Sequence, residues 1–191
     1  MSKTAITAAP ILPVIAERWS PRSYDASYTA TQHELLSILE AGRWAPSANN
    51  LQPWRYSLLA KGTDLHAKVL ATFSGFNQVW AANASHILIV SIVTKTADGA
   101  EHAIAKFDAG LSVQNMLLQA QELGLAAHPT SGYDHGAVNA ILQFPTDVES
   151  LVAVVLGKLA SPDLLEGPLK ERELGTRVRK DLDDIVLHGK P

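Results

Sequence analysis

Residues 104–123 read IAKFDAGLSVQNMLLQAQEL, and this stretch gives the strongest indication of the fold. Its apolar residues recur at helical spacing, but at about 100° per residue they form two stripes rather than one. The first stripe holds Ile104, Phe107, Leu111 and Leu118. The second holds Ala105, Ala109, Val113, Met116, Leu117, Ala120 and Leu123, and the stripes are separated by the polar residues Asp108, Ser112, Asn115 and Gln119. The helix therefore lies either between its own sheet and a second layer, such as another subunit, or at the centre of a larger core.

Upstream of this helix, the pattern predicts helices alternating with strands. Thr31-Gln32-His33-Glu34 matches a capping box, so a helix is expected to begin there, run to about Trp44 and stop before Pro46. A strand is expected over 54–59, followed by a helix that Asp64 caps and that runs through Phe73. Residues 86–93, HILIVSIV, have the composition of a strand buried on both faces.

Downstream, the elements become shorter and then strongly charged. Gly124 is expected to end the long helix, a short strand is expected over 125–128, and Asp134 is expected to cap a helix through Leu142. Residues 151–156 are expected to form the last buried strand. From residue 158 onward the chain is rich in charge, which predicts an extension of one domain spanning 1–191. Such an extension is usually solvated or disordered, although apolar residues near its end could dock on another surface.

Composition narrows the class of protein. The chain has 191 residues, 47% of them hydrophobic, and a formal net charge of −3, so it presents no uniform field that would attract nucleic acid or a membrane surface. No cysteine is present, which excludes disulfides and thiolate chemistry. The apolar runs are far shorter than the roughly 20 residues of a membrane span. These features lead us to expect a cytoplasmic protein with no nucleic-acid or membrane partner.

Several common catalytic signatures are missing. There is no glycine-rich dinucleotide or phosphate loop and no nucleophile elbow. The seven histidines lack paired spacing, so no metal site is expected. His86 is interpreted as structural and His102 as part of a solvated loop or helix start. His128, close to Asp134 and His135, fits either a site or, more simply, a turn.

Two arginine clusters remain as candidates for ligand binding. Arg18, Ser20 and Arg22 alternate, so in an extended segment their side chains share one side, and Arg177 and Arg179 repeat the spacing. Each cluster alone also fits a surface ion pair. Together with the amide-rich stretch 45–54, APSANNLQPW, they indicate a ligand that carries both a phosphate and a hydrogen-bonding heterocycle.

The ordered motifs resemble those of the flavin-dependent nitroreductase family over about residues 15 to 187. They are Arg18-x-Ser20-x-Arg22-x-Tyr24, the stretch 45–54, Ala84-Ser85-His86, Asp108-Ala109-Gly110 with Gln114-Asn115, Gly124-Leu125 and Gly132-Tyr133-Asp134. The resemblance implies an α+β fold with a central mixed or antiparallel sheet flanked by helices. It also implies a homodimer with one FMN at each of two sites shared between the subunits.

The resemblance further implies which residues contact the flavin. Arg22 and the backbone amides of Ser131 and Gly132 would stabilise the reduced ring, so these three are the expected catalytic groups. Arg177 and Arg179 would hold the phosphate. The other expected cofactor contacts are Arg18, Trp19, Ser20, Ala48, Asn77 and Thr130, together with Pro46, Ser47 and Asn50 of the partner subunit.

The implied activity is ping-pong oxidoreduction, in which NADH or NADPH reduces the flavin and a nitroaromatic or quinone-like acceptor reoxidises it. Enone reduction, reductive dehalogenation, a non-catalytic flavin-binding module and an interaction domain without cofactor are the alternatives. Trp19, Trp80 and Ser131 depart from the residues of many relatives, which puts the substrate in doubt more than the flavin. Trp80 fits either a pocket wall or the core, and stretch 45–54 also fits a plain helix-to-strand turn.

Overall fold

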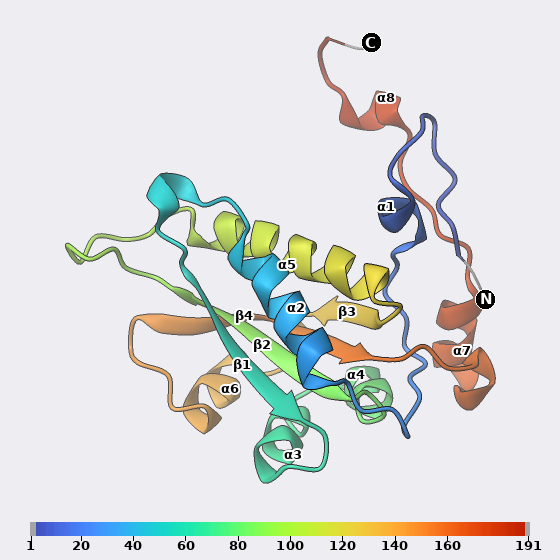
Figure 1. The fold of residues 1–191 in the computed structure, drawn as a ribbon, viewed down its shortest axis with the longest axis horizontal. Helices are drawn as coiled ribbons and strands as arrows, with labels where there is room; N and C mark the ends of the chain where they lie inside the picture. The colour runs from blue at the N-terminus through green and yellow to red at the C-terminus, as the bar shows by residue number, and fades with distance from the viewer. Residues whose placement is uncertain (1–2, 190–191) are drawn as a thin grey trace.

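The computed structural model describes residues 3–189, so the first two and last two residues of the expected 1–191 domain lie outside the description. Within this range, four antiparallel strands form one sheet in the order β1-β2-β4-β3. The strands are β1 (Trp54–Ala60), β2 (His86–Val93), β3 (Ala126–Thr130) and β4 (Val148–Gly157). The expected α+β fold with a central antiparallel sheet is confirmed (Figure 1).

Helices cover both faces of the sheet and also gather beside it (Figure 1). One face carries α2 (Gln32–Arg43) and α5 (Ala105–Glu122). The opposite face carries α3 (Asp64–Leu70), α4 (Phe76–Ala81) and α6 (His135–Ile141). Near the chain ends lie α1 (Pro13–Glu17), α7 (Gly167–Leu174) and α8 (Leu182–Ile185), and two short 3-10 turns, η1 (Ala48–Asn50) and η2 (Pro162–Leu164), complete the elements.

Strand β2 shows why the apolar run HILIVSIV has to lie at the centre of the sheet. Its side chains alternate in direction, so Ile87 and Ile89 pack in the cluster under α3, α4 and α6, while Leu88 and Val90 pack in the cluster under α2 and α5. All four are fully buried. The prediction of a strand covered on both faces is confirmed.

Local capping accounts for most helix starts. The Thr31–Glu34 capping box is present, and the side chain of Asp134 accepts a hydrogen bond from the amide of Ala137, so both expected starts are confirmed. The cap of α3 was predicted one residue too late. Thr63, not Asp64, accepts from His66, and α3 ends at Leu70 rather than Phe73 because the chain then turns into a bridge with Tyr133.

Helix α5 buries only one of its two apolar stripes. Ala105, Ala109, Met116 and Ala120 are fully or almost fully buried against the sheet and α2, whereas Phe107 is 67% exposed and Ile104 is 44% exposed. The sheet and α2 therefore cover the second stripe, whereas in the first stripe Ile104 and Phe107 are exposed and Leu111 and Leu118 are half-buried.

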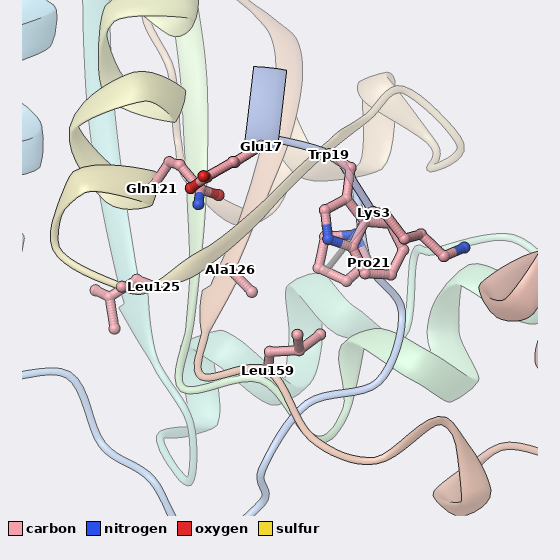
Figure 2. Close-up of a pocket in the computed structure, with 9 residues that line it drawn as sticks. Lys3, Glu17, Trp19, Pro21, Gln121, Leu125, Ala126 and Leu159 are labelled. Atoms are coloured by element: carbon pink, nitrogen blue, oxygen red, sulfur yellow. The ribbon is translucent and has the colours of Figure 1, made fainter. Parts of the chain in front are cut away.

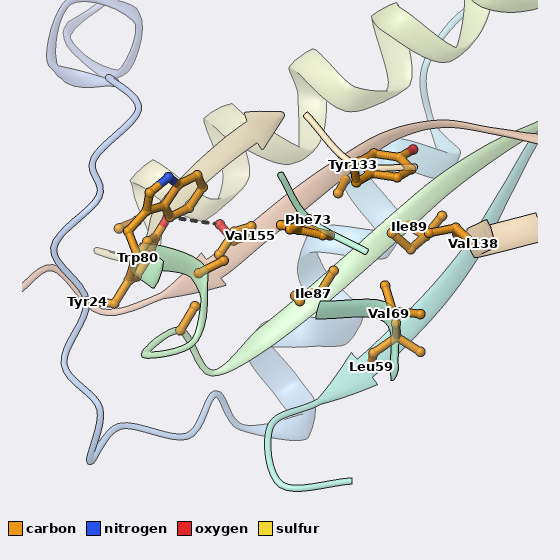
Figure 3. Close-up of a cluster of buried hydrophobic side chains, with 14 of the residues drawn as sticks. Tyr24, Leu59, Val69, Phe73, Trp80, Ile87, Ile89, Tyr133, Val138 and Val155 are labelled. Carbon is orange, nitrogen blue, oxygen red and sulfur yellow. Dashed lines mark hydrogen bonds between the residues drawn. The ribbon is translucent and has the colours of Figure 1, made fainter. Parts of the chain in front are cut away.

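Trp80 belongs to the core and does not line a pocket, which decides between its two interpretations. Its ring is 1% exposed and stacks on the ring of His128, with centroids 4.4 Å apart. Tyr24 stacks nearby on Trp80 and donates its hydroxyl to the carbonyl of Val155 (Figure 3). The expected strand at 125–128 is confirmed as β3, so the alternative that His128 lies in a turn is wrong.

The charged extension divides into a packed part and an exposed part. Leu165 and Leu169 join the core cluster, and Glu173 on α7 is only 3% exposed. Beyond Gly175 the chain runs beside the N-terminal segment and ends at α8, where Leu182, Ile185 and Leu187 are exposed (Figure 1).

Candidate functional site

The segment Arg18–Tyr24 is held from two sides, which fixes the direction of its arginine side chains. The buried carboxylate of Glu173 accepts hydrogen bonds from the amides of Arg22, at 2.8 Å, and Ser23, at 3.2 Å. On the other side, Nδ1 of His128 donates to the carbonyl of Pro21 at 2.8 Å. Helix α7 and strand β3 therefore hold the backbone from which the side chain of Arg22 extends.

Arg18, Arg177 and Arg179 form a guanidinium cluster at the meeting point of the two chain ends. Burial, and then the positive charges of Arg177 and Arg179, lower the pKa of Arg18 below its ordinary value. Among the described residues no ion pair involves any of the three. Arg177 is oriented by two bonds of 2.6 Å from its Nη1 to the carbonyls of Lys3 and Ala16. Like charges gathered without a carboxylate make a site suited to a polyanion such as a phosphate.

Trp19 faces a cavity of about 310 Å³ that also contacts the end of α5 (Figure 2). The cavity is lined by Trp19 and Pro21 but by none of Arg18, Ser20 and Arg22, which agrees with alternation along an extended segment. The ammonium of Lys3 lies 4.5 Å from the Trp19 ring centroid. Trp19, expected beside the flavin with the arginines, thus points to the opposite side of the segment.

The segment 130–132 begins at the last residue of β3 and is bonded to α4. Asn77 contacts both Thr130 and the carbonyl of Gly132, and its Oδ1 accepts from the indole of Trp80 at 3.1 Å. A Cβ on Gly132 would clash with Nδ2 of Asn77, so a larger residue at this position would displace the Asn77 side chain. The Gly132 amide, expected to serve the flavin, already donates to Oγ1 of Thr130 at 3.2 Å.

The stretch 45–54 connects α2 to β1 and adopts an unusual backbone. Asn49, Asn50 and Gln52 have φ of 49°, 56° and 47°, in the left-handed region that non-glycine residues rarely occupy. Ser47 accepts a hydrogen bond from the amide of Gln52, and Ala48 donates its amide to the carboxylate of Asp108 at 3.1 Å. The side-chain amide of Gln52 donates to the backbone carbonyl of Asn50 at 2.9 Å, as the alternative of a plain helix-to-strand turn also expects, so both interpretations of the stretch stay open.

One subunit does not bring the two halves of the expected site together. The loop is bonded to Asp108 near the start of α5, whereas Trp19 shares its cavity with Gln121 near the end of the same helix. Thirteen residues of α-helix separate Asp108 from Gln121, a distance of about 20 Å. Pro46, Ser47, Ala48 and Asn50 therefore lie toward the opposite end of α5 from Trp19.

The histidines have separate structural roles. His86 bonds to Ser85 and is confirmed as structural. His135 stacks on Tyr133 and bonds to the carbonyl of Ser150. The side chain of His102, expected in solvent, is only 7% exposed and lies beside Asp108, because the loop before α5 folds back onto the helix. Within residues 3–189, no group of three or more acidic or histidine side chains could hold a metal ion.

Comparison with known proteins identifies the family. The sequence profile of the nitroreductase family matches residues 15–75 and 60–158, which is more than half of the chain. The chain belongs to the nitroreductase family.

Individual nitroreductase-family relatives cover nearly the whole chain. A crystal structure described as that of an oxidoreductase containing FMN aligns with 100% of this chain and 97% of its own, at 32% identity and a TM-score of 0.90. The oxygen-insensitive NAD(P)H nitroreductase of Salmonella typhimurium is 26% identical in an alignment 206 positions long, gaps included, that covers 85% of this chain and 94% of that protein. A protein of Desulfovibrio desulfuricans solved in complex with FMN shares the fold at 24% identity and a TM-score of 0.77, over 96% and 99% of the two chains.

Two residues that hold the candidate site, Glu173 and Asp108, were not predicted to do so from the sequence. Glu173 lies in a charged stretch that favoured a solvated tail, and nothing local distinguishes it from Glu171 or Glu166. Asp108 was visible within a family motif, but its bond to Ala48 joins residues sixty apart. In the described part of the chain, no helix is long and apolar enough to cross a membrane.

Proposed function

We propose that this chain is an FMN-dependent NAD(P)H oxidoreductase that works as a homodimer. The observation that carries the proposal is the cluster of Arg18, Arg177 and Arg179, three guanidinium groups with no ion-pair partner among the described residues. Positive charges gathered without a carboxylate attract an anion, and the FMN phosphate matches the cluster in charge and in the paired bonds that guanidinium groups donate to phosphates. The FMN found in family members and the NAD(P)H in the names of relatives support the same cofactors here.

A second copy would complete the site. Ile104 and Phe107 on α5 are exposed, as are Leu36 and Trp44 on and after α2, and Trp44 lines a groove together with Leu118 of α5. Exposed apolar side chains are thus spread over the two outer helices. If two copies pack through this surface with their α5 helices antiparallel, the start of one helix lies near the end of the other. The loop carrying Ser47 and Asn50 then reaches the arginines of the partner. Exposed apolar surface of this kind favours association.

Bound FMN would carry two electrons between a nicotinamide donor and an oxidised acceptor. The chain itself would supply position and electrostatics. Arg22 would stabilise negative charge on the reduced ring, with the Ser131 amide as a second donor, and Glu173 keeps the backbone of Arg22 in place. Asn77 and Ser20 would orient the pyrimidine edge. No side chain needs to act as an acid or a base on the substrates.

The donor and the acceptor would bind one after the other over the same exposed ring face, which gives ping-pong kinetics. Nitroaromatic and quinone-like compounds are the proposed acceptors, since both are flat and accept electron pairs. Holding the donor or the acceptor within about 3–3.5 Å of the flavin ring would then be the protein's main contribution to the reaction rate.

Purification under mild conditions, followed by a visible spectrum, tests this proposal. We expect a yellow dimer whose flavin absorbance is bleached by NADH or NADPH without oxygen and returns when a nitroaromatic or a quinone is added. Parallel lines in double-reciprocal plots would support the ping-pong order. Bleaching followed by reoxidation only by enones or halogenated phenols would support the alternative reactions. A colourless protein that takes up no added FMN would contradict the proposal.

The dimer is tested separately by light scattering. Phe107→Asp places a charge in the proposed interface, and because the ring is 67% exposed in one subunit, folding should not suffer. We expect half the mass of the wild-type particle and weaker FMN binding. A variant that stays dimeric with unchanged flavin content would show that the subunits meet elsewhere.

A further inference from the structure

Asp108 is a buried carboxylate for which the proposed chemistry has no use. Its side chain is 2% exposed, and it lies in the first turn of α5, where the helix dipole favours negative charge. One carboxylate oxygen accepts the amide of Ala48 at 3.1 Å, and Nε2 of His102 lies 3.9 Å from the same oxygen. Burying a carboxylate is costly, so a specific bond must compensate.

The group that Asp108 holds is a strained loop. Three residues between Asn49 and Gln52 have positive φ without being glycine, a conformation that persists only where neighbouring structure imposes it. Most hydrogen bonds of this loop are local, such as those from the amides of Asn50 and Gln52 to Ser47. The bond from Ala48 to Asp108, by contrast, anchors the loop to the main body of the domain.

We infer that Asp108 is a positioning residue that clamps loop 46–52 in its left-handed conformation, and that through this loop it supports the flavin of the partner subunit. The inference rests on the proposed function, because that proposal places Ser47 and Asn50 against the partner's cofactor. Asp108 touches neither cofactor nor substrate. It keeps the loop ready to bind, so no ordering cost arises when FMN enters.

The hydrogen bond from the amide of Ala48 to the carboxylate of Asp108 can be removed by changing either residue. Asp108→Ala deletes the acceptor. Ala48→Pro deletes the donor with little other change, because residue 48 opens a 3-10 turn and Ser47 before it is extended, with φ −146° and ψ 153°, as a following proline requires. Glu149→Gln is the matched control, since it neutralises an exposed carboxylate paired with Lys106 on the same helix.

Two measurements on the purified dimer test whether Asp108 holds the loop and whether this supports FMN binding. Hydrogen exchange of the peptide covering the loop, measured on cofactor-free protein, should become faster in both variants but not in the control. The Kd for FMN should rise about tenfold or more, as expected for a lost bond to a charged group. The Kd for FMN of the double variant should be no higher than the Kd of the single variant that binds FMN more weakly. Asp108→Asn, whose amide oxygen can still accept, should restore most of the affinity.

Contradicting results are equally clear. Unchanged loop exchange overturns the clamp, and faster exchange with a wild-type Kd shows a purely structural role. Effects that multiply in the double variant would show that the two residues act separately. A wild-type chain that takes up no FMN overturns the proposed function instead, and the exchange measurement then still decides whether Asp108 holds the loop.

Mixed dimers test the action across subunits. In a dimer of one Arg18→Ala chain and one Asp108→Ala chain, one site has both defects and the other has neither. We expect one FMN per mixed dimer to bind with wild-type affinity, although both parent homodimers bind weakly. Absence of any wild-type site would show that Asp108 serves the flavin of its own subunit and would overturn the inference.

Discussion

Acidification should destabilise this protein in a way that can be traced to His128. The imidazole is buried between Trp80 and the segment Arg18–Tyr24, and burial, together with the charges of Arg22 and Arg18, lowers its pKa from 6.5 to about 4, against the smaller opposing effect of its bond to Pro21. Below pH 6.5 the unfolded chain takes up a proton on this ring, while the folded chain resists doing so. Stability is therefore unaffected above pH 6.5 and falls as the pH drops toward 4.

The expected size of the effect follows from the pKa difference. About 2.5 pH units at about 1.4 kcal/mol per unit give at most about 3.5 kcal/mol, and about 3 kcal/mol near pH 4, where the ring is already protonated in half of the folded molecules. His128→Asn removes the titrating group and keeps an amide nitrogen near the position of Nδ1, which can still donate to Pro21. The variant loses the stack on Trp80, so its stability at pH 7.5 should be lower, but its stability should depend less on pH.

Urea unfolding at a series of pH values, followed by tryptophan fluorescence, measures this difference. The gap between wild type and His128→Asn should shrink by about 3 kcal/mol between pH 7.5 and pH 4. The carboxylates and the buried His66 and His86 are present in both proteins, so their contributions cancel in the difference in unfolding free energy. A gap that stays constant with pH would refute the reasoning.

Three further predictions concern the site and the core. Glu173→Ala leaves the amides of Arg22 and Ser23 without an acceptor, so the free energy of unfolding should fall by about 2–4 kcal/mol in urea; a loss below about 1 kcal/mol would mean that water replaces the carboxylate. Arg18→Ala removes repulsion within the guanidinium cluster, so calorimetry of the apoprotein should show an unchanged or higher Tm. Titration with FMN should show binding weakened about tenfold. A lower Tm with unchanged FMN binding would assign Arg18 a structural role. Gly42→Ala would place a Cβ 2.2 Å from the end of the Met116 side chain, so thermal unfolding should show a loss of about 1–3 kcal/mol, whereas a gain would show that Met116 moves aside freely.

The sequence by itself determined the elements whose causes are local. The capping box at Thr31–Glu34, the apolar run of β2 and the cap at Asp134 depend on residues a few positions apart, and each was found where predicted. The start of α3 was placed one residue late for a related reason, since Thr63 and Asp64 are both capping residues and only the backbone geometry chooses between them.

Only the tertiary structure decided which of the many polar residues are buried and what they hold. Glu173 and Asp108 look like their charged neighbours until α7 packs on Arg22 and the loop before β1 folds onto α5. The same applies to the two apolar stripes of α5, because periodicity shows that both can pack but not that the sheet covers just one. Burial and charge at a residue are set by groups distant in sequence, and one chain alone separates the halves of the expected site by about 20 Å of helix.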